Sequence, residues 1–180
     1  MKDIVKDKNN VPCQRAVTPI PVVSFVGHSG SGKTTLLERL ACELKQRGYR
    51  LAVIKHHHHH GLAFDTPGKD SYRFADAGVD HVVLAGPDRV IHIRSFEEEP
   101  TLESLLNGIQ EVDLILTEGY KHADTLKIEV NRAAAQAPLI SGPERLIALV
   151  ADHQVDIAVP LFDLDDIAEL AAFIEERLLR

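Results

Sequence analysis

Apolar residues along this chain form two kinds of segment, short continuous runs and longer periodic ones. The short runs, rich in aliphatic and β-branched residues, predict buried strands at 22–26, 51–54, 113–119, 127–130 and 146–150. Two further runs, at 81–85 and 90–93, predict strands joined by the turn Gly86-Pro87-Asp88. Apolar residues spaced three and four positions apart predict helices at 35–47, 69–77, 101–109 and, after the acids at 163–166, from 167 to 178. Because strands alternate with helices, we predict an α/β fold with a mostly parallel sheet, helices on both faces and ligands at the carboxyl ends of the strands.

The segment between the first strand and the first helix carries the clearest chemical signal. It fits the phosphate-loop pattern G-x-x-x-x-G-K-[ST] at every fixed position: Gly27, His28, Ser29, Gly30, Ser31, Gly32, Lys33 and Thr34. The glycines let successive N–H groups point inward, and the helix N-terminus adds its positive dipole end. Lys33 then reaches the β- and γ-phosphates, and the Thr34 hydroxyl ligates Mg²⁺. The sequence therefore predicts a three-layer P-loop NTPase fold that binds a nucleoside triphosphate.

A phosphate loop also needs an acid for its magnesium ion, and two acids of one predicted strand compete for this role. Glu118 closes the strand at the carboxyl edge, whereas Asp113 opens it, about 17 Å away at ~3.3 Å per residue. We assign the ion to Glu118, because Gly119 behind it allows a close approach of backbone to ligand. Asp70 is a second candidate, through water, although an acid at a helix N-terminus explains this residue equally well.

Two further features of the carboxyl edge have open interpretations. The run His56 to His60 follows the second strand, inside the fold, which argues against an affinity tag. Imidazole suits zinc, nickel and copper, but consecutive histidines alternate in direction, so a metal site and a contact with phosphate, partner or cofactor stay equally open. Asp152 follows the strand 146–150, where it is either an acceptor for guanine N1 and N2 or a turn-forming residue.

Composition narrows the class of protein. The chain has 180 residues and a net charge of −7, which argues against a dedicated nucleic-acid binder. We expect a flexible tail at 1–20 and one domain at 21–180. No apolar stretch is long enough to cross a bilayer, and no signal peptide is evident. Only Cys13 and Cys42 are present, so we expect no disulfide framework and a reducing cytoplasm.

Several motifs, in order, give this chain a family resemblance. It resembles the molybdopterin-guanine dinucleotide biosynthesis protein B (MobB) family from about residue 21 to 152, in the segments 27–36, 53–60, 67–71, 77–78, 118–121 and 127–130. The resemblance implies a Mg²⁺-dependent, GTP-binding protein with weak GTPase activity that forms a homodimer. Its implied partner is the molybdopterin guanylyltransferase that joins GMP to molybdopterin, with molybdopterin itself and molybdoenzymes as further partners.

The resemblance also implies where the site lies. The phosphate contacts fall on Gly30 to Thr35, and the magnesium acid is Glu118. Lys33 and Glu118, with Asp70 in the Pro-Gly-Lys-Asp-Ser segment, carry the catalytic roles in this interpretation.

Three other functions compete with this one. The histidine run suggests a nickel or zinc metallochaperone GTPase, although the guanine-reading motif Asn-Lys-x-Asp typical of such proteins is absent from the sequence. A strand ending in Glu-Gly also occurs in P-loop small-molecule kinases, but the arginines that such a kinase lid needs are scattered here. A scaffold that binds nucleotide without hydrolysing it is the third alternative.

Overall fold

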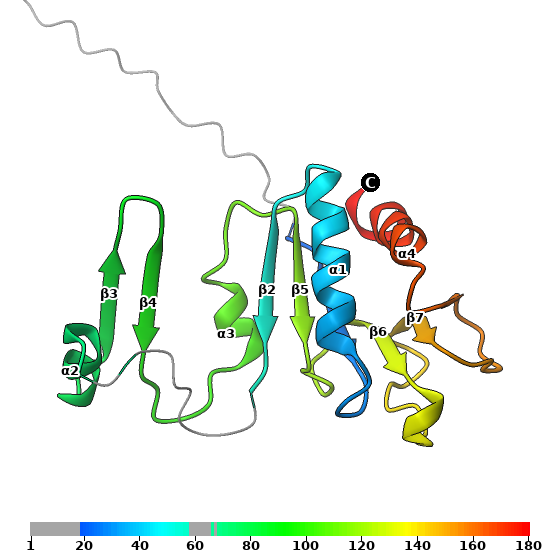
Figure 1. Cartoon of the computed structure of the whole chain (residues 1–180), viewed down its shortest axis with the longest axis horizontal. Helices are drawn as coiled ribbons and strands as arrows, with labels where there is room; N and C mark the ends of the chain where they lie inside the picture. Colours follow the sequence, from blue (N-terminus) through cyan, green and yellow to red (C-terminus); the bar gives the residue numbers. More distant parts are fainter. Residues whose placement is uncertain (1–18, 58–65, 67) are drawn as a thin grey trace, which may run out of the picture.

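A six-stranded parallel sheet organises the chain, of which the computed structural model describes residues 19–57, 66 and 68–180 (Figure 1). From edge to edge its strands are β2 (Leu51–Lys55), β5 (Leu114–Glu118), β1 (Val22–Val26), β6 (Leu126–Asn131), β7 (Leu146–Ala151) and β8 (Leu161–Phe162). All neighbouring pairs run parallel, so the carboxyl ends of the strands meet along one edge. The short strand β8 was not predicted.

One face of the sheet carries the hydrophobic core. Helix α1 (Lys33–Gln46) and helix α4 (Ile167–Ile174), which continues as the π-helical turn η2 (Glu175–Leu179), pack against each other (Figure 1). The buried residues of the core come from both helices and from four strands: Val23, Phe25, Leu36, Leu37, Leu40, Leu44, Leu114, Leu116, Ile128, Val130, Ile147, Ala148, Val150, Leu170, Ala171 and Ile174. This parallel sheet with flanking helices confirms the predicted fold class.

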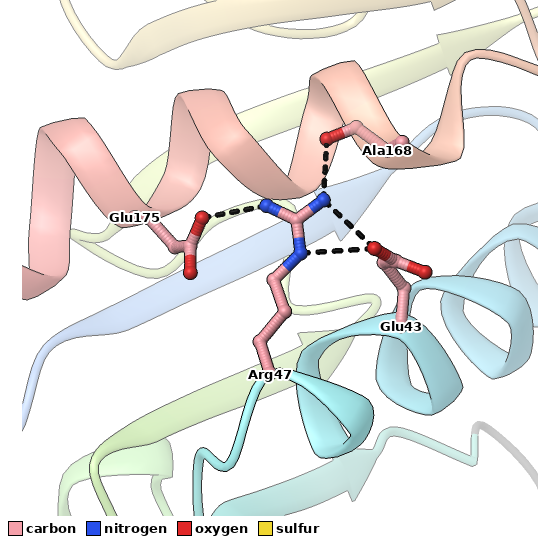
Figure 2. A network of polar contacts seen from close by, with 4 residues as sticks. All are labelled: Glu43, Arg47, Ala168 and Glu175. Atoms are coloured by element: carbon pink, nitrogen blue, oxygen red, sulfur yellow. Dashed lines mark hydrogen bonds and ion pairs between the residues drawn. The ribbon is translucent and has the colours of Figure 1, made fainter.

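A polar network fastens the two helices together (Figure 2). Arg47, directly after α1, donates to Glu43 at 2.9 and 2.8 Å, to Glu175 at 2.6 Å and to the carbonyl oxygen of Ala168 at 2.9 Å. Hydrogen bonding to Arg47 lowers the pKa of Glu175, which favours the ionised carboxylate. The network fixes α1, and with it the loop at the start of α1, against the C-terminal part of the chain.

The opposite face of the sheet is buried but strongly polar on β6. Strand alternation points Lys127, Glu129 and Asn131 to this face, and all three are nearly or fully buried. Lys127 donates to the carbonyl oxygen of Ala123 at 2.6 Å, and Glu129 accepts from the backbone N–H groups of Ile140 and Ser141 at 2.8 and 2.9 Å. Buried charges need such partners, so these side chains hold the loops 120–125 and 136–142 over this face.

The predicted pair of strands at 81–85 and 90–93 forms a separate unit. β3 (His81–Ala85) and β4 (Val90–Arg94) pair antiparallel in their own two-stranded sheet, and α2 (Asp70–Asp76) packs on β3. The helix predicted at 101–109 spans only Leu102–Leu106 (α3), capped by Thr101, because the chain turns at Gly108. No helix in the described ranges is long and apolar enough to span a bilayer.

Candidate functional site

The phosphate loop lies at the carboxyl end of β1 and leads directly into α1. Its glycines have the left-handed backbone that side chains disfavour: φ is 141° at Gly27, 77° at Gly30 and 88° at Gly32. A Cβ on Gly27 would lie 2.2 Å from the carbonyl oxygen of Val130 on β6, and one on Gly32 would lie 3.2 Å from the Arg132 guanidinium. Gly27 is therefore required by close approach to backbone as well as by conformation, whereas Gly32 is favoured by its conformation and lies against the movable end of Arg132.

Lys33 curls back over this loop. Its Nζ donates to the carbonyl oxygens of Gly27 and His28 at 3.0 and 2.6 Å and to Ser31 Oγ at 3.3 Å. Burial lowers the pKa of Lys33, while the nearby Glu118 carboxylate acts in the opposite direction. An ammonium group held among loop carbonyls beside inward-facing amides is placed to grip the phosphates of a nucleotide. His28 also contacts the other wall of the site, with its Nε2 3.0 Å from the carbonyl oxygen of Pro138.

The structure brings Thr34 and Glu118 together, as the sequence predicted. Thr34 Oγ1 donates to Glu118 Oε1 at 2.8 Å. Lys55, in register with Glu118 on the neighbouring strand, places its Nζ 3.1 Å from both Thr34 Oγ1 and Glu118 Oε2. The hydroxyl and the carboxylate are the hard oxygen ligands that Mg²⁺ prefers, and an ion between them would displace the Lys55 ammonium. These residues fit a magnesium ion.

Asp113, which directly precedes β5, has a structural role. Asp113 binds Arg50 through the backbone N–H at 2.7 Å, Nε at 3.2 Å and Nη2 at 2.7 Å. These hydrogen bonds from Arg50 lower the pKa of Asp113 to about 2. Asp113 therefore fixes β2 beside β5 at the amino end of the sheet, far from the phosphate loop.

Asp70 lies outside this group of residues. It opens α2, its side chain is 88% exposed, and it contacts Arg73 at 3.8 Å. The physical reason is that α2 packs on β3, so Asp70 belongs with the hairpin and does not line the cavity beside Lys33.

A cavity of about 620 Å³ opens beside Lys33 and Glu118 and is lined further by His56, Glu99, Tyr120 and Ile140. His56 Nε2 lies 2.5 Å from Glu99 Oε1, and the imidazole stacks on Tyr120 with centroids 4.7 Å apart. Tyr120 has φ 54°, a strained conformation that directs its ring to this wall. In the described residues, which exclude His58 to His60, no three His, Cys, Asp or Glu side chains are grouped to hold a metal.

A second cavity of about 260 Å³ lies at the other side of the phosphate loop. Gly32 and Thr35 line it together with Arg132 and Asp152. Asp152 accepts from the backbone N–H of Ala133 at 2.8 Å, which lowers the pKa of Asp152, and its Oδ2 lies 3.6 Å from Arg132 Nη1. Asp152, the residue that the sequence offered for base recognition, thus lies next to the phosphate loop and is already bound by Ala133 and Arg132.

Sequence reasoning gave no individual role to three residues of the site: Lys55 and Tyr120 lie in the segments 53–60 and 118–121 that carry the family resemblance, and Arg132 was missed. Lys55 and Arg132 each stand at or just after the carboxyl end of a predicted strand, which was the available signal for both. Tyr120 follows the Glu-Gly pair, but its left-handed backbone is visible only in the fold.

Comparison with known proteins agrees with this geometry. The family model described as Molybdopterin guanine dinucleotide synthesis protein B matches residues 22–152. The chain is 37% identical over 161 residues to the molybdopterin-guanine dinucleotide biosynthesis adapter protein of Haemophilus influenzae, covering 88% of this chain and 90% of that protein. It is 38% identical over 169 residues to the protein of the same name from Escherichia coli K12, covering 88% and 94%.

Solved structures agree as well. The crystal structure of Bacillus subtilis MobB matches with a TM-score of 0.71 and 28% sequence identity, covering 88% of this chain and 98% of that one. The family match includes the phosphate loop, the strand that ends in Glu118, and both Arg132 and Asp152. The chain belongs to the molybdopterin-guanine dinucleotide synthesis protein B family.

Proposed function

We propose that this protein binds GTP with Mg²⁺ and acts as an adapter in molybdenum cofactor biosynthesis, assisting the transferase that attaches GMP to molybdopterin. The observation that carries the nucleotide part is the convergence of the phosphate loop, Lys33, Thr34 and Glu118 at one strand edge. The adapter part rests on the names of the Haemophilus influenzae and Escherichia coli relatives, which the chain matches over most of their length.

The geometry supports a simple division of roles. Amides from Gly30 to Thr35 cradle the phosphates, and the Lys33 ammonium exchanges its loop carbonyls for β- and γ-phosphate oxygens. Thr34 Oγ1 and the Glu118 carboxylate would hold Mg²⁺, which neutralises phosphate charge during hydrolysis. Hydrolysis is slow in this proposal, because Glu118, the carboxylate next to Lys33, is committed to Thr34 and the ion.

Guanine selectivity falls to Asp152 in this proposal. A carboxylate accepts hydrogen bonds from guanine N1 and N2, whereas adenine offers no matching pair of donors. This recognition requires the ionised form of Asp152, which the hydrogen bond from the Ala133 backbone favours by lowering the pKa.

A homodimer is the proposed assembly, and the α2–β3–β4 unit is its proposed interface. Most of the large hydrophobic side chains that the described structure exposes belong to this unit or follow it directly: Tyr72, Phe74, Val79, Val83, Leu84, Val90 and Phe96. An apolar surface of this kind on a two-stranded sheet is typical of a protein interface. Sedimentation of the wild type against a Phe74→Ser, Val83→Ser, Val90→Ser variant tests it, and a monomeric wild type contradicts the proposal.

A titration of GTP against ATP in the presence of Mg²⁺ tests the nucleotide part. We expect GTP to bind more tightly than ATP, and Lys33→Ala to weaken GTP binding strongly. Multiple-turnover phosphate release that disappears in Lys33→Ala supports GTPase activity. If the protein binds GTP but releases no phosphate over many turnovers, it acts as a binding adapter only. Equal affinity for the two nucleotides contradicts the proposed function, since the donor in this chemistry is a guanine nucleotide.

A further inference from the structure

Arg132 is a cation on the opposite side of the phosphate loop from Lys33. It follows β6, the strand next to β1, and its guanidinium rests on Gly32: a Cβ built on that glycine would lie 3.2 Å from Nη2, 3.8 Å from Nε and 3.9 Å from Cζ. Lys33 lines the larger cavity, whereas Arg132 lines the smaller one with Gly32 and Thr35. The loop therefore has one cation at each flank.

The hydrogen-bonding capacity of Arg132 is little used by the described part of the protein. A guanidinium carries five N–H donors. The described contact is a 3.6 Å ion pair with Asp152, and Nε has no hydrogen-bond partner among the described residues. By contrast, Arg39 at the same cavity donates to Asp165 at 2.7 Å and to the carbonyl oxygen of Leu164 at 3.2 Å. Arg132 is thus held beside the loop by packing and by one long ion pair, which leaves Nη donors for a ligand.

The place of Arg132 along the loop indicates which part of a nucleotide it meets. In a phosphate loop the lysine reaches the β- and γ-phosphates, and the amides at the start of the helix meet the α- and β-phosphates. Arg132 shares its cavity with Gly32 and Thr35, at that second end. A phosphate oxygen there would replace a 3.6 Å ion pair with a shorter, charge-assisted hydrogen bond, the geometry for which a guanidinium is best suited.

We propose that Arg132 binds the α-phosphate of the nucleotide, so that this protein grips the monophosphate part of GTP separately from the β- and γ-phosphates held by Lys33. The guanidinium exchanges its ion pair with Asp152 for the phosphate, which leaves the Asp152 carboxylate free for the base. This inference rests on the proposed function. It predicts that Arg132 contributes to the affinity for every guanine nucleotide, whereas Lys33 contributes only to the affinity for GDP and GTP. Measurements with one nucleotide alone would not separate the two roles.

The test is a set of affinities for guanosine, GMP, GDP and GTP, measured by calorimetry or by competition against a fluorescent GTP analogue. We expect Arg132→Gln to weaken the binding of GMP, GDP and GTP by a similar factor, about 10- to 100-fold, and to leave the affinity for guanosine unchanged. Arg132→Lys should recover part of the loss. Lys33→Ala should weaken the binding of GDP and GTP and leave the affinity for GMP unchanged. Arg145→Gln is the control, because Arg145 is exposed to 44% against 42% for Arg132 and precedes β7 at the amino end of the sheet.

The outcomes separate this inference from the proposed function. If Arg132→Gln weakens guanosine as much as GMP, the guanidinium contacts the nucleoside and the α-phosphate assignment is wrong. If it changes no affinity while Lys33→Ala abolishes GTP binding, the inference fails and the proposed function stands. If the wild type binds no guanine nucleotide, the proposed function itself fails. Thermal unfolding of each variant confirms that the changes are not losses of fold.

Discussion

Gly27→Ala tests the contact between the phosphate loop and β6, and its cost follows from the structure. The backbone of Gly27 has φ 141°, which costs a residue with a side chain roughly 1–2 kcal/mol. The added Cβ would lie 2.2 Å from the carbonyl oxygen of Val130, a backbone atom, so the loop or β6 must shift. Such overpacking costs about 1–3 kcal/mol. We expect the free energy of unfolding to fall by about 2–5 kcal/mol.

Gly48→Ala is the matched control for this change. Gly48 also has positive φ, 95°, but a Cβ there would meet no atom within 4 Å, so only the conformational cost of roughly 1–2 kcal/mol applies. Urea denaturation followed by circular dichroism gives both free energies, and a GTP titration reports the loop, since Gly27 supplies a carbonyl to Lys33. If Gly27→Ala matches Gly48→Ala to within about 0.5 kcal/mol and binds GTP normally, the loop does not lie against β6 as described.

The remaining predictions concern the sheet, the core and the ion. Asp113→Asn should destabilise the protein at about pH 6, where Asp113 is ionised in both the folded and the unfolded state. Because the pKa of Asp113 falls from 3.8 to about 2 on folding, its contribution is lost as the pH drops from about 4 to 2. The difference in the free energy of unfolding between variant and wild type should therefore narrow over this range in acid titrations of stability. Leu40→Ala removes a fully buried side chain of the core, so urea denaturation should show a loss of about 2–5 kcal/mol, and a loss below about 1 kcal/mol would place Leu40 outside the core. Glu118→Gln should remove the Mg²⁺ dependence of GTP affinity, and an unchanged dependence would exclude Glu118 as the ligand.

Local patterns predicted the central parallel strands well, because apolar runs and their order are encoded in neighbouring residues. They also predicted the phosphate loop and the pairing of Thr34 with Glu118, since both residues stand at the carboxyl edge that a parallel sheet creates. Asp113 stands at the amino end of the predicted strand, but its bond to Arg50 could not be foreseen, because the neighbour of β5 is fixed only by strand order.

What could not be predicted depends on contacts distant in sequence. Glu129 lies in a strand read as apolar, and its burial is explained only by two backbone N–H groups of the loop 136–142. Asp70 was expected near the ion because it follows β2, yet α2 packs on the hairpin. Arg132 meets Gly32 because β6 lies beside β1, an adjacency between strands that are far apart in the sequence.

A crystal structure of the protein with a non-hydrolysable GTP analogue and Mg²⁺ is the decisive test of nucleotide binding at the phosphate loop. We expect phosphates within hydrogen-bonding distance of the amides of Gly30 to Thr35, with Lys33 turned from its loop carbonyls to the β- and γ-phosphates. We expect the ion between Thr34 Oγ1 and the Glu118 carboxylate. A nucleotide bound elsewhere, or a phosphate loop without ligand at saturating concentration, would contradict this mode of binding.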